Sequence, residues 1–237
     1  MSGPPRAALL DFLRTCAIFE KLPAGELESL AATAREDPCP AREYVFHEGD
    51  PALFLCFVKT GHIRIVRHTP AGKTVVLELL GPGEVFGGVA VFERRPYPAS
   101  AQAAEPTVVV KLPADAVIGV AQRHPSVVAE LVRLIGRRLR AAHDSVTSLS
   151  VDPVEARLAT RLLRLADREG VPDPRGVELP FHLTRQSLAD MSGTTVETTI
   201  RVVSRWIKDE LVEDRAGRLV IKKPEALRDL AGGAAAP

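Results

Sequence analysis

A short stretch near the C-terminal end of the chain carries side chains that are suited to reading DNA bases. Glu197 and Arg201 stand four residues apart, so a helix places both on one face. A guanidinium donates well to O6 and N7 of guanine, and a carboxylate accepts from the amino group of cytosine. Val196 and Ile200 are apolar on the same face, which suits contact with thymine methyl groups. The pattern predicts a helix that enters the major groove.

Residues 183–207 predict the helix-turn-helix that would position this face. Two helices that cross at a sharp angle need a small residue where they touch, here Ala189. They also need a residue that tolerates positive φ in the turn, here Gly193. Residues 211–223 then predict two short strands around Ala216 and Gly217, which would form a wing. The alternative is an unrelated helical hairpin, which the apolar outward positions disfavour.

The second helix of this motif is expected to begin near Thr194 or Thr195. Thr194 and Glu197 have the spacing of a capping box, which gives Glu197 a second, structural role. The positions expected to face inward are Thr199, Val202, Val203 and Trp206.

A long helix is predicted before this motif, and Pro125 marks its start. Its apolar residues recur at alternating spacings of four and three, which is the a/d seam of a coiled coil. Arginines flank the seam and argue against burial, so we expect two copies of the chain to pair as a homodimer. The alternative is a helix that lies on its own barrel. The seam consists of Val128, Val132, Ile135, Leu139, Ala142, Val146 and Leu149. After it, Asp152 is expected to cap a further helix.

The N-terminal half predicts a β-rich domain behind a short helical region. Residues 7–36 have a helical pattern, with a boundary at 22–26. From about 41 to 115, short β-type runs alternate with turn signals, and Thr69 to Gly72 form one hairpin signal. Many short strands at this spacing are typical of a closed or double-sheet barrel. The fold class is therefore α+β.

Composition sets further bounds. The chain has 237 residues and a formal net charge of +1, so a role in DNA binding rests on the local motif and not on overall charge. Cys16, Cys39 and Cys56 form no CxxC pair, which indicates a reducing compartment without a disulfide framework. No apolar run is long enough for a transmembrane helix. We expect a cytoplasmic protein with no membrane association.

The order of β-barrel, long helix and winged helix-turn-helix resembles the CRP/FNR family of bacterial transcription regulators over nearly the whole chain. The matching stretches are FHEGDPA (46–52), TGHIRIV (60–66), GPGEVFG (81–87) and LTRQSLADMSGTTVETTIRVVSRW (183–206). The resemblance implies an N-terminal double-stranded β-helix, a jelly roll of the cyclic-nucleotide-binding type, at 1–122. It implies a dimerisation helix at 123–151 and a winged helix-turn-helix DNA-binding domain at 152–237.

The resemblance also implies residue roles in DNA binding. Arg185, Gln186 and Thr195 would contact phosphates or base edges, while Glu197 and Arg201 would read bases. Val196 stands where the FNR branch has valine, which implies a TTGA-type half-site in a two-fold-symmetric double-stranded site. Ile200 departs from the serine of that branch and leaves the outer base preference open. RNA polymerase is the further partner that the family implies.

The segment 85–101 is the phosphate-binding cassette in the cyclic-nucleotide branch of the family. There, a glutamate holds the ribose, and an arginine–serine pair holds the phosphate; here Gly88, Pro98 and Ala99 stand at those positions. A buried phosphate without its cation would cost several kcal/mol, which argues against cyclic AMP. The pocket, if occupied, should prefer an apolar or metal-centred ligand. The candidate effector pocket consists of Gly87, Gly88, Val89, Pro98, Ala99 and Ser100.

Other cofactors of the family are weighed in the same way. An iron–sulfur cluster needs four thiolates, and the chain has three separated cysteines, which argues against a cluster. The stretch RPYPASAQA resembles the nitrogen-oxide-sensing branch, some of whose members use haem, and His124 and His143 are the candidate haem ligands. We therefore expect a redox, nitrogen-oxide or other non-cyclic-nucleotide signal. The alternatives are a cyclic-nucleotide-responsive or an effector-independent regulator.

Two other classes of protein are disfavoured. A cupin-type metalloenzyme needs an HxH…E ligand set, whereas His62 and His68 stand six residues apart. A regulatory subunit without a DNA role would not need the winged motif. The chain is therefore not expected to be an enzyme.

Overall fold

The computed structural model describes residues 6–69 and 74–232, and the chain divides into two compact units. The first unit comprises residues 1–73 and 77–140, and the second comprises residues 74–76 and 141–237. The division falls inside helix α5 (Pro125–Val151). Each unit is described separately.

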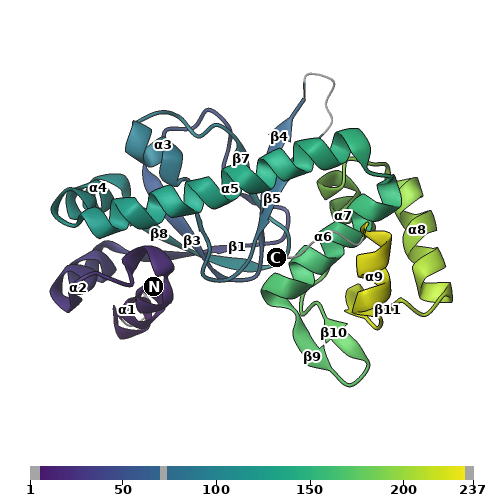
Figure 1. Cartoon of the computed structure of the whole chain (residues 1–237). Coiled ribbons are helices and arrows are strands. Elements are labelled where there is room, and N and C mark those ends of the chain that lie inside the picture. Colours follow the sequence, from purple (N-terminus) through teal and green to yellow (C-terminus); the bar gives the residue numbers. More distant parts are fainter. Residues whose placement is uncertain (1–5, 70–73, 233–237) are drawn as a thin grey trace. The chain divides into compact units, whose positions relative to one another are not determined.

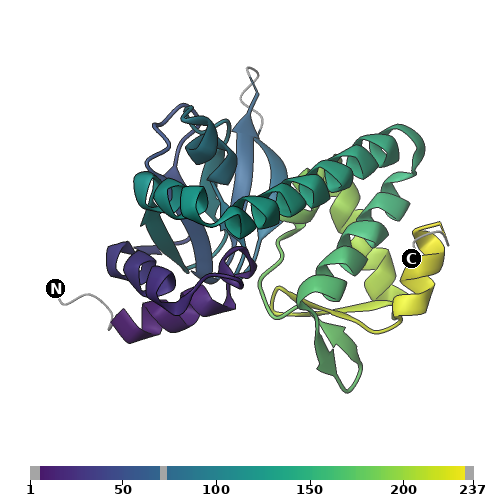
Figure 2. The same cartoon turned by 60° about the vertical axis from the view of Figure 1, so that its left-hand side comes forward.

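Short helices open the first unit. They are α1 (Arg6–Thr15), the single-turn helix η1 (Ala17–Phe19) and α2 (Ala24–Thr33). Both views show α1 and α2 side by side (Figures 1 and 2). The helical region, expected to reach residue 36, ends at Thr33, three residues early, because Arg35 and Glu36 begin strand β1. Pairing of these residues with Lys111 and Val110 of strand β8 overrides their local helical preference.

Strands β1 to β8 form two four-stranded sheets, with the orders β1-β8-β3-β6 and β2-β7-β4-β5. The double-sheet architecture expected from the sequence is therefore confirmed. Residues 70–72 of the expected Thr69–Gly72 hairpin signal lie outside the described residues. The strands are β1 (Arg35–Cys39), β2 (Tyr44–Phe46), β3 (Phe54–Thr60), β4 (Ile63–His68), β5 (Thr74–Leu80), β6 (Val85–Phe86), β7 (Ser100–Ala103) and β8 (Thr107–Pro113).

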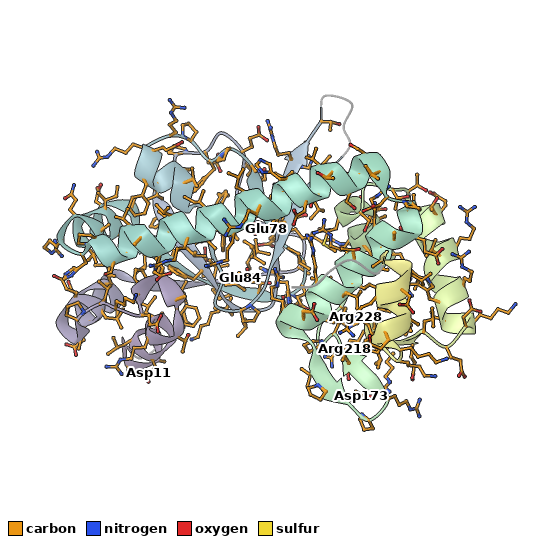
Figure 3. The ribbon with its side chains drawn as sticks, in the orientation of Figure 1. Asp11, Glu78, Glu84, Asp173, Arg218 and Arg228 are labelled. Carbon is orange, nitrogen blue, oxygen red and sulfur yellow. The ribbon has the colours of Figure 1, made fainter. Side chains whose placement is uncertain are left out.

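Helices α3 (Gly88–Glu93) and α4 (Ala114–Arg123) complete the first unit together with the first part of α5. Helix α5 begins at Pro125, as expected. Val127 and Leu131 anchor it in a core that includes α1, α2 and α4. Arg138 of α5 also pairs with Glu78 at 2.9 Å, and Figure 3 shows Glu78 beside the helix.

The second unit contains a helical bundle and a small sheet of order β11-β12-β10-β9. The expected wing is confirmed: β11 and β12 are joined by Ala216 and Gly217, whose φ angles of 52° and 90° fit a type I′ turn. Figure 1 shows α9 beside α6. The elements are α6 (Val154–Glu169), β9 (Val171–Asp173), β10 (Gly176–Glu178), α7 (Arg185–Met191), α8 (Val196–Lys208), β11 (Val212–Arg215), β12 (Arg218–Ile221) and α9 (Pro224–Leu230).

The expected cap of α6 is wrong. Pro153 occupies the N-cap position, and no side chain caps the helix. The side-chain carboxylate of Asp152 instead accepts a hydrogen bond from the Ser148 hydroxyl. The backbone carbonyl of Asp152 accepts one from Arg157 at 2.8 Å. Asp152 therefore bonds to Ser148 and Arg157 and does not cap α6.

In the described part of the chain, no helix combines the length and the apolar character that a membrane span requires.

Candidate nucleic-acid interface

Helix α7 and the turn after it form the first half of the helix-turn-helix. Thr184 caps α7, and its hydroxyl accepts a hydrogen bond from the Ser187 amide at 3.0 Å. Ala189 is fully buried, and its carbonyl accepts from the Thr194 amide at 3.1 Å. Gly193 has φ +60°, so the expected small residue and the expected turn glycine are both confirmed.

Helix α8 begins one residue later than the expected capping box requires. Thr195 is the N-cap, and its hydroxyl accepts from the Thr198 amide at 3.2 Å. The Thr194–Glu197 box is therefore wrong, because Thr194 still belongs to the turn through its bond to Ala189. Among the described residues, the Glu197 carboxylate has no hydrogen-bond or ion-pair partner, which leaves it free to contact a ligand.

Helix α8 has one buried face and one exposed face. The positions expected to face inward are confirmed: Thr199, Val202, Val203 and Trp206 are all at most 6% exposed. The Trp206 indole donates to Glu155 of α6 at 2.8 Å and so ties α8 to the domain core. On the opposite face, Ile200 is 47% exposed, although isoleucine is usually buried.

The structure brings the predicted DNA-contacting residues together on α7, on α8 and at the N-cap of α8. Thr195, Glu197, Ile200 and Arg201 are exposed, and Val196 is half-buried. The two residues on the first turn of α7 already have partners. Arg185 pairs with Asp214 at 2.6 Å, and Gln186 donates to Asp190 at 2.7 Å.

Charged side chains surround the wing in an ion-pair cluster that the sequence reasoning missed. Arg215 pairs with Asp173 at 2.8 Å and with Glu213 at 3.0 Å, and its hydrogen bonds lower the pKa of both carboxyls. Figure 3 labels Asp173 and Arg218 in this sheet. The mixed acidic and basic residues of 213–218 could have indicated ion pairs in the wing. Which of them pair depends on the alignment of the strands, which the sequence does not give.

Two arginines of α6 donate hydrogen bonds to backbone carbonyls at the end of α7. The sequence did not predict these contacts. Arg157 Nε donates to the Ser192 carbonyl, and Arg161 Nη2 donates to the Met191 carbonyl, each at 2.9 Å. Cationic donors stabilise the carbonyl end of a helix, here the end of α7. The signal was a series of arginines at helical spacing, which places Arg157, Arg161 and Arg164 on one side of α6.

The a/d seam is exposed along α5. Val132, Leu139 and Val146 are 61%, 54% and 64% exposed, and the other seam residues are exposed as well. The side of α5 that packs on its own unit is a neighbouring stripe that contains Val127, Leu131 and Leu134. The first part of α5 therefore lies on its own unit, as the alternative expected, but it does so through this stripe and not through Val128 and Val132 of the seam.

The segment expected to form the effector pocket is tightly packed at its glycines. Gly87 has φ +77° and leads β6 into α3. A Cβ atom on the buried Gly88 would lie 3.2 Å from Leu55 Cδ1 and 3.3 Å from Leu131 Cδ1. A larger side chain at position 88 would therefore have to displace core leucines.

The other residues of the expected pocket are either buried in existing contacts or exposed to solvent. Ser100 Oγ accepts from the Glu48 amide at 2.9 Å, and Ala99 is buried. Val89 and Pro98 are exposed.

Tyr97 fills space beside these residues. Its ring stacks on Phe46 at 3.6 Å, and its hydroxyl donates to the Phe54 carbonyl at 2.6 Å. The two arginines of the segment, Arg94 and Arg95, are exposed beyond α3. No basic side chain of 85–101 is therefore buried where it could neutralise a phosphate.

The candidate haem ligands are not placed in a common site. His124 Nε2 lies 3.2 Å from the Glu26 carboxylate, and His143 is exposed on the part of α5 that belongs to the second unit. Within residues 6–69 and 74–232, no group of three or more His, Cys, Asp or Glu side chains suits a metal ion. An axial haem ligand needs a free nitrogen in an apolar cavity, and neither histidine fits that requirement.

The three cysteines are buried in the first unit. Cys16 lies in the core formed with the N-terminal helices, and Cys39 and Cys56 lie in the core between the sheets. Burial raises the pKa of the Cys16 and Cys56 thiols to about 12. Because the thiolate is the reactive form, these side chains behave as small apolar residues.

A winged helix-turn-helix with an exposed face on its second helix defines the second unit as a DNA-binding domain. Residues 36–124 match the cyclic nucleotide-binding domain model, and residues 156–230 match the Crp-like helix-turn-helix domain model. These two matches cover more than half of the chain.

Known proteins agree with this assignment. The chain is 26% identical to the CRP-like cAMP-activated global transcriptional regulator of Mycobacterium tuberculosis, over 84% of this chain and 92% of the relative. It is 27% identical to the transcriptional activator protein anr of Pseudomonas aeruginosa, over 84% of this chain and 81% of the relative. Its fold is similar to that of FixK2 from Bradyrhizobium japonicum, with a TM-score of 0.77, 24% identity, and coverage of 85% of this chain and 99% of that chain. The chain belongs to the CRP/FNR family of DNA-binding transcription regulators, which are not enzymes.

Proposed function

We propose that this regulator acts as a homodimer that reads a two-fold-symmetric DNA site through α8. The observation that carries the proposal is the exposed face of α8, where Ile200 stands beside Glu197, which has no partner in the described part of the chain. The opposite face of the helix is buried in the core. Such a face fits the major groove, and paired half-sites lie about one helical turn apart.

Each residue of the interface has a proposed role. Arg201 donates to guanine, Glu197 accepts from cytosine, and Val196 with Ile200 packs against thymine methyl groups. Arg185, Gln186 and Thr195 contact phosphates or base edges. By its likeness to the FNR branch at Val196, the half-site is of the TTGA type.

The dimer forms through the exposed seam of α5. Seven apolar or small residues at a/d spacing are exposed on one helix, and pairing with a second copy would bury them. In the proposed division of labour, residues 1–122 sense a signal, 123–151 dimerise and 152–237 bind DNA. RNA polymerase is the further partner that the family supports.

The proposed signal is not a cyclic nucleotide. The support is chemical: Gly88, Pro98 and Ala99 offer neither the carboxylate nor the cation that a cyclic nucleotide needs, and a side chain at position 88 would have to shift Leu55 and Leu131. A redox, nitrogen-oxide or other signal that acts at the packed pocket residues 87–89 and 98–100 remains the proposal. The buried cysteines and the two histidines do not supply an evident thiol or haem sensor.

A second candidate is a cyclic-AMP-responsive regulator. It is favoured by relatives whose names include cAMP-activated or cyclic AMP receptor, at 26% and 28% identity. Thermal unfolding of the protein with and without cyclic AMP separates the two candidates.

The proposed function is tested by DNA binding at fixed ionic strength. A duplex with two inverted TTGA-type half-sites, one helical turn apart, is compared with the same duplex in which one half-site is scrambled. We expect two chains per duplex and a large loss of affinity on scrambling. Equal affinity for both duplexes, or one chain per duplex, would refute the proposal.

A further inference from the structure

The second unit contains a small cavity behind the helix-turn-helix, away from the residues assigned above. Its volume is about 50 Å³, and the residues that line it come from the end of α5, from α6 and from the end of α7. All of them belong to the second unit. About 10–15 Å³ of such volume suffices for one water molecule, so the cavity has room for a group of several heavy atoms.

The lining of the cavity is strongly cationic. Arg157, Arg161 and Arg164 project from one side of α6, and Asp144 is the only acidic lining residue among those described. Arg164 pairs with Asp144 at 3.2 Å. In the described residues, Arg161 has no carboxylate partner, and burial together with neighbouring Arg164 lowers its pKa. A partly buried cation without a counter-charge is costly, so an anion would stabilise it.

A second observation also points to a ligand. Ser192 lines the same cavity and is 3% exposed, and its buried Oγ atom has no hydrogen-bond partner within residues 6–69 and 74–232. Buried hydroxyls are almost always hydrogen-bonded, because leaving one unpaired costs free energy. The Ser192 backbone is already used, since its carbonyl accepts from Arg157 at 2.9 Å. The hydroxyl therefore has capacity for one more hydrogen bond, and its residue borders the cavity.

We propose that this cavity binds a tetrahedral oxyanion of the phosphate class, held by Arg161 and Arg164 and by the Ser192 hydroxyl. Guanidinium groups match the geometry of phosphate oxygens, and a hydroxyl can donate to a third oxygen. The oxyanion would join α6 to the turn of the helix-turn-helix, because Ser192 directly precedes Gly193. Its source is either free phosphate or a phosphoryl group of DNA, which share this chemistry. The proposal does not depend on the base-reading roles of α8.

The test uses the full-length protein and inorganic phosphate, without DNA. Phosphate is titrated by calorimetry and by thermal unfolding, with chloride at equal ionic strength as the reference. We expect phosphate to bind and to raise the unfolding temperature beyond the effect of chloride. Ser192→Ala and Arg164→Gln should each weaken phosphate binding by roughly tenfold, since each removes a hydrogen bond to a charged group.

Two further variants keep the test independent of folding defects. Arg168→Gln removes the same charge from α6, but Arg168 pairs with Glu169 and does not line the cavity, so it should weaken phosphate binding far less than Arg164→Gln does. Asp144→Asn removes the acidic lining residue and should tighten phosphate binding by a few-fold, a gain that misfolding cannot produce. Equal responses to phosphate and chloride, or equal phosphate affinity of wild type, Ser192→Ala and Asp144→Asn, would overturn the proposal.

A DNA arm separates the two sources of the oxyanion. If free phosphate is the ligand, Ser192→Ala weakens phosphate binding by the same roughly tenfold factor and leaves DNA affinity in phosphate-free buffer unchanged. If the DNA backbone supplies the phosphoryl group, Ser192→Ala weakens DNA binding, and free phosphate competes with DNA at constant ionic strength. Both results support the oxyanion site, and a variant that changes neither measurement contradicts it.

Discussion

At the scale of single residues, Glu197, whose carboxylate has no partner among the residues that the structure describes, and the exposed Arg201 are the most informative features of the interface. The cap at Thr195 removes the structural role that the sequence suggested for Glu197, so contact with a ligand is the role that remains. Arg201 is exposed on the same face. Arg205 stands one turn further along α8 but pairs with Glu155, which makes it a matched control.

We expect Arg201→Ala to weaken binding to the specific duplex by about 1–3 kcal/mol and to leave binding to scrambled DNA nearly unchanged. The reason is the loss of a guanine contact with little loss of phosphate contact. Competition binding on both duplexes measures the difference. Arg205→Ala should reduce both affinities slightly and equally. An equal loss on both duplexes for Arg201→Ala would contradict the base-reading role.

Arg185 is held by Asp214 of the wing in the free protein, so binding a DNA phosphate requires the exchange of one partner for another. Asp214→Asn should therefore tighten DNA binding by roughly two- to five-fold, the value of a partly exposed ion pair. Asparagine keeps an oxygen for the Gly217 amide, so the wing turn should persist. Asp209→Asn removes the same charge elsewhere on the domain and serves as the control. If both variants gain equally in a binding assay at fixed salt, the effect is one of overall charge.

Glu26 links the N-terminal helices to Arg123 and His124, whose hydrogen bonds lower its pKa to about 2. A carboxyl whose pKa is lower in the folded state stabilises the fold above its unfolded pKa, near 4.5. This contribution is lost as the pH falls from about 5 to 2. Glu26→Gln should therefore lower the free energy of unfolding at pH 7 and not at pH 2, as measured by urea titration. Glu20→Gln, at an exposed glutamate, should show no such dependence on pH.

At the scale of elements, α5 carries two stripes that are one residue out of phase. Val127 and Leu131 pack on the first unit, while Val128 and Val132 are exposed. A single helix can therefore hold its own domain and present a seam to a second copy. The 4-3 spacing in the sequence predicted the exposed stripe but not the neighbouring buried one, because both consist of the same kinds of residue.

Leu139→Asp should dissociate the proposed dimer, because it places a charge in the middle of the seam. Arg137→Asp changes a neighbouring exposed position of α5 that lies off the seam, and it should leave the dimer intact. Sedimentation velocity at several protein concentrations measures the outcome. An unchanged profile for Leu139→Asp would refute the seam.

The success of sequence reasoning also varies by element. The helix-turn-helix and the wing could be predicted, because Gly193 and Ala216–Gly217 mark turns by their own conformational preferences. Strand β7 was missed, because its residues Ser100–Ala103 are small and have little strand preference of their own. The arginine contacts behind α7 and the pairing of Arg185 with Asp214 could not be predicted. They depend on which elements meet in three dimensions.

At the scale of the whole molecule, membership of the family does not identify the signal to which this regulator responds. The packing of residues 85–101 is the most direct evidence on that question. In this segment Tyr97 stacks on Phe46, and the backbone at Gly87 and Gly88 lies close to neighbouring side chains. The relatives include both cAMP-activated and FNR-type regulators, so the family alone does not choose between these signals.

Cyclic AMP should leave the unfolding temperature of this protein unchanged at millimolar concentration. A ligand that binds only the folded state stabilises it in proportion to the logarithm of its concentration relative to Kd. Differential scanning fluorimetry with and without the nucleotide measures this, and the specific DNA duplex serves as a positive control. A shift that grows with cyclic AMP concentration would favour the second candidate function.

Leu149 is the last residue of the seam, and it also lies against the turn of the helix-turn-helix. A Cβ atom on Gly193 would come within 2.4 Å of Leu149 Cδ2, so the two residues are in direct contact, while 52% of Leu149 is still exposed. This side chain therefore serves two surfaces at once. In the proposed dimer, a change at position 149 that alters pairing also alters the contact with the turn before α8, so we expect pairing and DNA binding to change together there.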